Sequence, residues 1–401
     1  MKLTVKVDKD FLYNNENIIE KNYNTSYSNY IILNNNEKGQ PDYHSVILDS
    51  SRKILSFAPP KPIETSLEFS FENNDLYVSE YIEGTFIHLF YDINIDSWEI
   101  ATKRAIGGNY FFYSAPDKYS VTYRQMFMEA CGLEKDSFIH SIPFLNDLNT
   151  NNCYGFVLQH PENHIVMNIL IPKLYLVSIY EIDNINSNVS FISPEIYTKN
   201  PLFGKNDIYF PRTYDLQKYP VHEYIKTHSS IHTPLIAMGI MITDLYNNQS
   251  YSVINPNYKE LAELRGNYPN IQYQYLCLNR IGKMEAFLNY FPQYTLDFSR
   301  YSKQYNTFIT NVHQSYLSYY VKKEGVVISP KYFPTIYDIH HSIFIPSMAN
   351  KDKIIIRRQV VKEYIDKMDP AKILFLLNYD DHFSIYGKKS DLWEKIEESG
   401  I

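Results

Sequence analysis

The chain is poor in cysteine, and the few cysteines it has exclude two kinds of site. They are odd in number and far apart in the sequence, at Cys131, Cys153 and Cys277. This spacing indicates neither a disulfide framework nor a Cys-x-x-Cys metal site. The chain also lacks the Gly-x-Ser-x-Gly, Walker A and Gly-x-Gly-x-x-Gly patterns. Hydrolase, P-loop and dinucleotide-binding functions therefore have no support in the sequence.

Long apolar runs are absent as well. No run approaches the roughly 18 residues that a membrane-spanning helix needs, and residues 1–17 lack the apolar core of a signal peptide. We therefore expect a cytoplasmic protein that makes no membrane contact. A formal net charge of −7 argues against a protein that coats nucleic acid generally, although a local basic groove is compatible with it.

What is present is typical of a folded protein with more than one domain. The 401 residues are enough for two or three domains. Residues 1–255 contain β-branched and aromatic runs broken by Asp, Asn, Gly and Pro, which predicts antiparallel strands. From residue 256 onward the apolar residues follow a helical period. The clearest helical stripe consists of Phe298, Tyr301, Tyr305, Phe308, Val312, Tyr316 and Tyr319. We expect a strand-rich domain over residues 1–255 and a helical domain over residues 256–401.

One stretch of the strand-rich part reads like a catalytic strand without its nucleophile. Residues 79–92 are SEYIEGTFIHLFYD, and they follow HSVILDSSRKILSFAPPK, which ends at Lys61. Together these segments resemble the entry region of the phage-type RNA ligases, members of the covalent nucleotidyltransferase superfamily, and of a ligase-like group from large DNA viruses. In that family a lysine of Lys-x-Asp-Gly attacks the α-phosphate of a nucleotide. Here the four positions read Tyr-Ile-Glu-Gly, so Glu83 and the glycine remain but Tyr81 occupies the nucleophile position.

The later motifs of the family show the same kind of replacement. By the resemblance, Lys103 keeps a basic position near the nucleotide, and Asn163 matches the asparagine of the third motif. The residues that would carry reactive or charged groups in the family are replaced by other residues here. Gly155 replaces a glutamate, His164 an arginine, Met238 the glutamate that serves the metal, and Ser252 and Ile254 two lysines that face the triphosphate.

The resemblance implies both a fold and a function. It implies an α+β fold, in which a nucleotidyltransferase (ATP-grasp-like ligase) domain of antiparallel sheets precedes an all-helical domain. Because the motif lysines are missing, we expect a catalytically inactive module that binds RNA, a nucleotide or an unknown protein partner. The residues expected to contact a nucleotide are Lys61, Glu83, Lys103 and Asn163. ATP binding is expected to be weak, with Mg²⁺ only if the nucleotide binds.

Two alternatives stay open at the level of sequence. The chain could be an active ATP-dependent RNA ligase with relocated catalytic residues, or a structural viral assembly protein that inherits the fold. A viral protein would be located in the host cytoplasm or in the virion. A phenol can attack phosphorus once deprotonated, but an aromatic residue that packs in a cleft is the favoured interpretation of Tyr81.

A second feature is a basic run near the C-terminus. Its cations are Lys351, Lys353, Arg357, Arg358 and Lys362. A helix is predicted over residues 352–368, and Asp369 before Pro370 predicts the start of the next one. The run is either a solvated helix face or, beside a ligase-like groove, a surface that follows an RNA backbone.

Two groups of histidines are weak metal candidates. His228 and His232 have helical i, i+4 spacing and His222 is near them, but the Ser-Ser and Thr-Pro pairs around them disfavour a stable helix. No acid or cysteine partner is in view. The neighbours His340 and His341 do not share a helix face. We predict no metal site.

Overall fold

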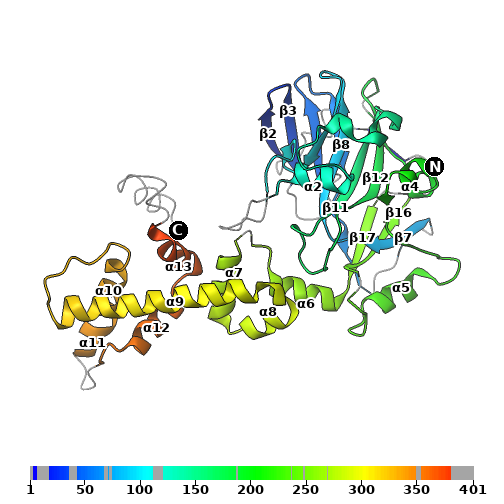
Figure 1. Ribbon diagram of the computed structural model, residues 1–401. Coiled ribbons are helices and arrows are strands. Elements are labelled where there is room, and N and C mark those ends of the chain that lie inside the picture. Colours follow the sequence, from blue (N-terminus) through cyan, green and yellow to red (C-terminus); the bar gives the residue numbers. More distant parts are fainter. Residues whose placement is uncertain are drawn as a thin grey trace. The chain divides into compact units, whose positions relative to one another are not determined.

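The computed structural model describes residues 3–6, 18–35, 43–66, 71, 75–111, 121–186, 188–235, 237–246, 249–268, 270–348 and 354–380. The chain folds into two compact units, Met1–Asn267 and Tyr268–Ile401. The domain boundary expected after residue 255 lies before the helix of residues 256–265, which belongs to the first unit. Figure 1 shows strands in the first unit and helices in the second, which confirms the predicted α+β class.

The described strands of the first unit form three sheets. The largest has the order β1-β13-β12-β11-β8-β9-β10, with β14 also paired to β12. Its strands are β1 (Leu3–Lys6), β8 (Thr85–Asp92), β9 (Ser97–Thr102), β10 (Ala105–Ile106), β11 (Asn152–Gln159), β12 (Lys173–Asp183), β13 (Asn188–Phe191) and β14 (Ile208–Tyr209). All its pairings are antiparallel except that of β12 with β14.

The two smaller sheets complete the strand-rich unit. One has the order β15-β7-β16-β17-β6 and the other the order β2-β3-β4-β5. The first comprises β6 (Ile63–Glu64), β7 (Leu76–Tyr81), β15 (Thr213–Tyr214), β16 (Gly239–Asp244) and β17 (Gln249–Ile254). The second comprises β2 (Ile18–Asn24), β3 (Asn29–Asn35), β4 (Ser45–Asp49) and β5 (Ile54–Ala58). Only the short pairing of β17 with β6 is parallel here.

The large sheet is buried on both faces. Successive side chains of a strand point to opposite faces, and β8 shows this directly. Ile87 and Leu89 join a core with α2 (Tyr123–Ala130), whereas Phe90 joins a core with the four-stranded sheet. The helix α2 contacts β11 and β12, and it lies over the large sheet in Figure 1. Its first turn is fixed by a capping box between Thr122 and Gln125.

The remaining helices of the first unit are short. They are η1 (Ile139–Ser141), η2 (Pro143–Asp147), α3 (Pro194–Tyr197), α4 (Pro201–Lys205), α5 (Val221–His228) and α6 (Pro256–Arg265). The helix α5 was disfavoured by the sequence, yet it forms and ends before Ser229. His232 therefore lies beyond the helix that holds His228, and the two do not share a helix face. Asn255 caps α6 by accepting a hydrogen bond from the backbone N–H of Asn257.

The elements of the second unit are all helices in its described part, joined by non-helical segments. Its elements are α7 (Ile271–Ile281), α8 (Met284–Tyr290), η3 (Pro292–Tyr294), α9 (Thr295–Tyr316), the π-helical η4 (Leu317–Val321), α10 (Phe333–Ile339), the π-helical η5 (His340–Phe344), α11 (Ile345–Met348), α12 (Arg358–Asp366) and α13 (Pro370–Leu377). Among the described residues, no helix combines the length and apolarity that crossing a membrane requires.

The predicted helical stripe is confirmed except at its end. Its members from Phe298 to Tyr316 are buried along α9. Tyr319 lies in the wider π-helical turn of η4 and is exposed. The helix predicted over residues 352–368 is shorter than expected in its described part, because residues 354–357 are not helical and α12 begins after Arg357. Asp369 caps α13 as predicted, through the backbone N–H of Ala371.

Candidate functional site

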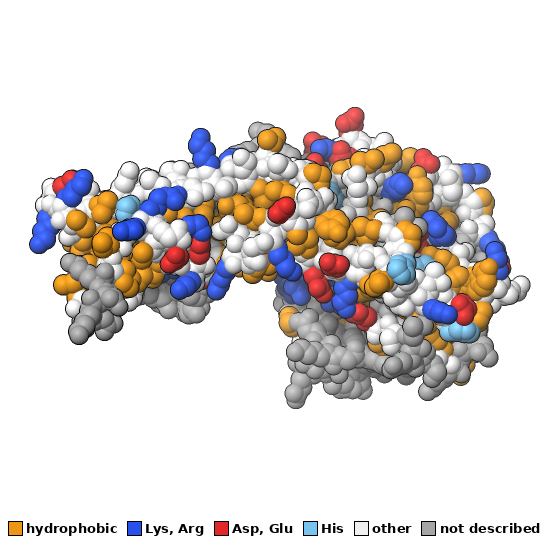
Figure 2. Space-filling model, turned by 90° about the horizontal axis from the view of Figure 1, so that it is seen from below, with side chains coloured by type: hydrophobic (Ala, Val, Ile, Leu, Met, Phe, Trp, Pro, Cys, Tyr) orange, Lys and Arg blue, Asp and Glu red, His pale blue; other side chains and the backbone are white. Residues whose placement is uncertain are grey.

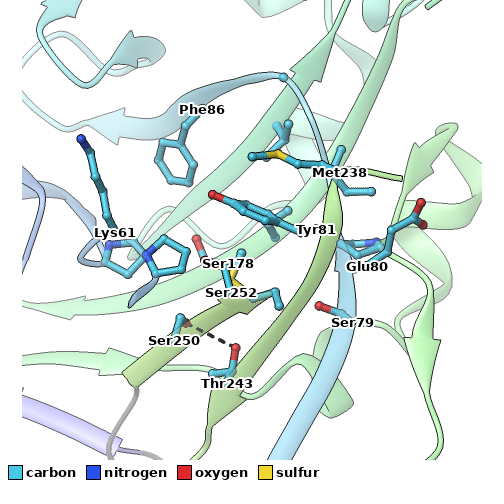
Figure 3. A pocket seen from close by; sticks show the side chains of 18 of the residues that line it. Lys61, Ser79, Glu80, Tyr81, Phe86, Ser178, Met238, Thr243, Ser250 and Ser252 are labelled. Atoms are coloured by element: carbon cyan, nitrogen blue, oxygen red, sulfur yellow. Dashed lines mark hydrogen bonds between the residues drawn. The ribbon is translucent and has the colours of Figure 1, made fainter. Parts of the chain in front are cut away.

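A cavity of about 460 Å³ lies within the strand-rich unit. Its walls come from β7, β16 and β17 of the five-stranded sheet, from β8 and β12 of the large sheet, and from the loop after β5. Figure 3 shows the Tyr81 ring reaching into this space with Phe86 and Met238 beside it. Cavities of this size hold small-molecule ligands in many proteins. The space is therefore a candidate binding site.

Residues from widely separated sequence motifs meet in this cavity. Its lining includes Lys61, Tyr81, Glu83, Gly84, Lys103, Met238, Ser252 and Ile254. Ser252 and Ile254 project on one face of β17 because they are two residues apart. The strand β16 brings Met238 beside them, since Gly239 pairs with both Ile254 and Tyr81.

Tyr81 is a poor nucleophile where it stands. It is the last residue of β7, and burial raises the pKa of its phenol above the usual value. The phenolate that could attack phosphorus is therefore less populated than in water. The structure favours the packing interpretation of this residue.

The missing acid at position 155 has a steric explanation. Gly155 lies on β11 opposite His88. A Cβ atom at this position would lie 2.3 Å from Oγ of Ser178 and 2.7 Å from Cζ of Phe86. The Phe86 ring thus lies where a side chain from position 155 would begin. The retained Gly84 is constrained in the same way, since a Cβ there would lie 2.5 Å from the carbonyl oxygen of Leu158.

The retained acid Glu83 holds a loop in place. Its buried carboxylate accepts hydrogen bonds from the backbone N–H groups of Ile165 at 2.6 Å, Val166 at 3.1 Å and Met167 at 3.1 Å. Both carboxylate oxygens are used, so the acid satisfies three donors of one segment. Glu83 lines the cavity, but its charge is directed to this loop.

Asn163 and His164 also make local contacts. The Asn163 side chain is buried and donates to Oγ1 of Thr85 at 2.7 Å. Nδ1 of His164 lies 2.7 Å from the carbonyl oxygen of Pro161. Neither residue is part of the cavity lining. Of the residues predicted to contact a nucleotide, the structure brings Lys61, Glu83 and Lys103 to the cavity, whereas Asn163 is not among the lining residues.

A group of cations lies at one side of the cavity. Burial lowers the pKa of the Lys103 ammonium to about 8, and the neighbouring charges of Lys61 and Arg104 act in the same direction. The same three cations and, above all, burial lower the pKa of His44 to about 3. Like charges held together in this way favour an anion between them.

Sequence reasoning named Ser252 but missed the other hydroxyls of the cavity lining. Ser178 on β12 is 4% exposed, and its hydroxyl has no hydrogen-bond partner among the described residues. Ser79, Thr243, Ser250 and Ser252 add further hydroxyls to the lining (Figure 3). One sequence feature could have indicated the Ser178 hydroxyl, because Ser178 is a small polar residue inside the largely apolar run KLYLVSIY.

The described residues offer no preformed set of protein ligands for a magnesium ion. Mg²⁺ prefers oxygen ligands such as carboxylates, and Met238 offers a thioether where the family has a glutamate. The described part of the chain contains no cluster of three or more His, Cys, Asp or Glu side chains that could hold a metal ion. His228 is engaged otherwise, with Nδ1 2.8 Å from the carbonyl oxygen of Tyr224 and Nε2 3.2 Å from the Tyr214 hydroxyl.

The basic run of the helical unit is partly neutralised or bonded. Lys362 forms an ion pair with Asp366 at 2.5 Å. The guanidinium of Arg358 donates to Thr310 and Asn306, both at 3.2 Å. Lys351 and Lys353 lie outside the described residues. On the face drawn in Figure 2, Lys and Arg side chains stand among hydrophobic and acidic ones and do not form one continuous patch.

Two solved ligase structures are similar to this chain. An archaeal ATP-dependent RNA ligase is 12% identical, with a TM-score of 0.41 over 87% of this chain and 83% of that chain. A putative ATP-dependent DNA ligase from Aquifex aeolicus is 12% identical, with a TM-score of 0.39 over 72% of this chain and 70% of that chain. No protein-family model matches.

Two curated relatives are viral proteins. The chain is 25% identical over 275 residues to an immediate-early protein ICP-46 homolog of Invertebrate iridescent virus 6, which covers 66% of this chain and 57% of the relative. It is 21% identical over 316 residues to the ICP-46 homolog of Invertebrate iridescent virus 3, which covers 77% of this chain and 63% of the relative. The chain thus spans about three fifths of the length of each relative.

Proposed function

We propose that the chain is a nucleotide-binding module on a ligase-like fold, and that it does not transfer the nucleotide to a lysine. One observation carries the proposal. Tyr81, Met238, Ser252 and Ile254, which replace reactive or charged groups of the family, line a single open cavity. The replacements thus remove the reactive groups of one site, whereas the cavity itself remains open to a ligand.

Each replacement removes a requirement of nucleotidyl transfer. The step needs an amine or another strong nucleophile, and the phenol of Tyr81 has a raised pKa. It also needs cations to stabilise the charge that develops on the phosphates. Ser252 and Ile254 supply none.

The groups needed for binding without transfer are still available. The Tyr81 and Phe86 rings offer aromatic surface to a base, and Ser178 offers a buried hydroxyl. Lys61 and Lys103 line the cavity as cations, and an ammonium group is an effective phosphate ligand. Among the described lining residues these are the two lysines on which the relocated-ligase alternative would depend.

Equilibrium dialysis with labelled nucleotides tests the binding. We expect saturable binding to the wild-type chain, and we expect Met241→Trp to weaken it because the larger side chain would fill the cavity that Met241 lines. Gly204→Ala is the matched control, because Gly204 is exposed on α4 and an added methyl meets nothing within 4 Å. Equal binding by wild type and a folded Met241→Trp variant would place the nucleotide elsewhere and overturn the proposal.

A further inference from the structure

We propose that the cavity selects nucleoside monophosphates over the corresponding triphosphates. This inference rests on the proposed function and names the class of ligand that the site accepts. It follows from the positions of hydroxyls, aromatic rings and charges around the cavity.

The inner part of the cavity suits an uncharged nucleoside. The Ser178 hydroxyl is buried without a partner in the described part of the chain, and such a group gains free energy when a ligand supplies a hydrogen bond. Figure 3 shows Ser178 beside the Tyr81 ring. A base and sugar combine the flat apolar surface and the hydroxyls that this lining complements.

Positive charge is present at one part of the lining only. Lys61 and Lys103 are the cations among the described lining residues. Neither has an ion-pair partner among the salt bridges of the described residues. Two ammonium groups match one phosphate monoester, which carries a charge of about −1.5 to −2 at pH 7.

The carboxylates of the lining do not cancel these two charges locally. Glu64 pairs with Lys259 at 2.7 Å, and Glu83 accepts from the backbone of residues 165–167. The Glu80 carboxylate points away from the Tyr81 ring (Figure 3). The cation pair therefore remains available to a ligand phosphate.

A triphosphate would bring charge that the cavity does not balance. The positions that face the triphosphate by the family resemblance are Ser252 and Ile254, and Met238 adds a thioether. Bringing additional phosphates against neutral and apolar groups costs solvation free energy without compensating ion pairs. The monophosphate avoids this cost and keeps both lysine contacts.

Binding should depend on the protonation of Lys103. The titratable groups that interact with it are Lys61, Arg104, His44 and His88, and none of them is acidic. The pKa of Lys103 is lowered to about 8 by burial and by the charges of Lys61 and Arg104. Below this pKa the ammonium attracts the phosphate, whereas above it the neutral amine does not. Monophosphate affinity should therefore fall about tenfold between about pH 7 and about pH 9.

The test compares AMP, GMP, CMP and UMP with their triphosphates and nucleosides by calorimetric titration at about pH 7 and about pH 9. We expect at least one monophosphate to bind several-fold more tightly than its triphosphate, with a Kd that rises about tenfold at the higher pH. Lys103→Arg keeps the positive charge at both pH values, so this variant should bind the monophosphate with little pH dependence. The nucleoside should bind more weakly and independently of pH.

The outcomes separate this inference from the function on which it rests. If a triphosphate binds as tightly as its monophosphate, or if the pH dependence persists in Lys103→Arg, the selectivity is wrong while a nucleotide-binding cavity stands. If no nucleotide or nucleoside binds at millimolar concentration, both proposals fall.

Discussion

The ring of Phe86 lies where the side chain of residue 155 would begin, so the two positions cannot both carry a large group. A Cβ atom on Gly155 would come within 2.7 Å of the ring and within 2.3 Å of the Ser178 hydroxyl. The acid that the resemblance to RNA ligases would place at position 155 is thus incompatible with the present position of the aromatic residue that lines the cavity. Restoring the family's glutamate alone would collide with the present packing.

We predict that Gly155→Ala destabilises the chain by about 1–3 kcal/mol, the usual cost of overpacking a tight interior. Urea denaturation would measure the change in the free energy of unfolding. Gly204→Ala should be neutral or slightly stabilising, because Gly204 is exposed on a helix and a methyl there meets no neighbour. Equal stability of Gly155→Ala and wild type would mean that Phe86 and Ser178 move aside freely.

Glu83→Gln should loosen the loop that the carboxylate holds. Gln has one acceptor oxygen in place of two and no charge, so at least one of the N–H groups of Ile165, Val166 and Met167 loses its partner. We expect a cost of about 1–3 kcal/mol, and faster hydrogen exchange at these three amides. The exposed Glu162, in the same segment, serves as the control through Glu162→Gln. Unchanged exchange in Glu83→Gln would show that the loop is held by other contacts.

Stability should decrease as the pH falls below about 6.5, in part because of His88. This side chain is 1% exposed between Ser56 and Ser45, whose hydroxyls lie 2.8 Å from Nδ1 and 3.2 Å from Nε2. Burial lowers its pKa from 6.5 to about 3. Between these values the unfolded chain binds a proton that the folded chain does not, so the proton favours unfolding.

The size of the His88 effect can be measured directly. One such proton changes the free energy of unfolding by about 1.4 kcal/mol per pH unit once the pH is well below 6.5. The loss of stability between about pH 7 and about pH 5 should therefore be smaller in His88→Gln than in wild type. His44 contributes in the same direction in both proteins. Parallel pH profiles for the two proteins would contradict the prediction.

If the helical unit follows an RNA backbone, Arg357 is the residue through which the described part of the basic run should act. It is exposed just before α12, whereas Arg358 donates to α9 and Lys362 pairs with Asp366. Arg357→Glu should then weaken RNA binding and reduce its salt dependence. Lys362→Gln is the control, with little expected change. If wild type, Arg357→Glu and Lys362→Gln bind RNA equally, or if none binds RNA at low salt, the basic run is a solvated helix face without an RNA-binding role.

The sequence predicted which strands form the site better than it predicted the contacts that their side chains make. The motif order indicated that Tyr81, Met238 and Ser252 belong to one site, because apolar strand patterns and retained glycines mark the strands that carry them. These residues do line one cavity. The predicted strands and the buried face of α9 followed from residue periodicity alone.

The parts that escaped prediction depend on partners distant in sequence. Glu83 contacts amides more than 80 positions later, and nothing in its local sequence indicates that its charge is used there. The overlap of Phe86 with position 155 depends on the register of β8 against β11. Residues 354–357, for which the residue pattern predicted a helix, are not helical and precede α12.

The most direct test of the central claim is the intact mass of the chain after incubation with ATP or GTP and Mg²⁺ or Mn²⁺. The measurement should follow denaturation without acid, so that a phosphoramidate would survive. We predict an unmodified chain, because by the resemblance to RNA ligases Tyr81 holds the position of the nucleophilic lysine and Met238, Ser252 and Ile254 hold those of other reactive groups. A mass increase of one nucleotidyl group that disappears in Lys61→Ala, Lys103→Ala or Tyr81→Phe would contradict the account and identify a working transferase.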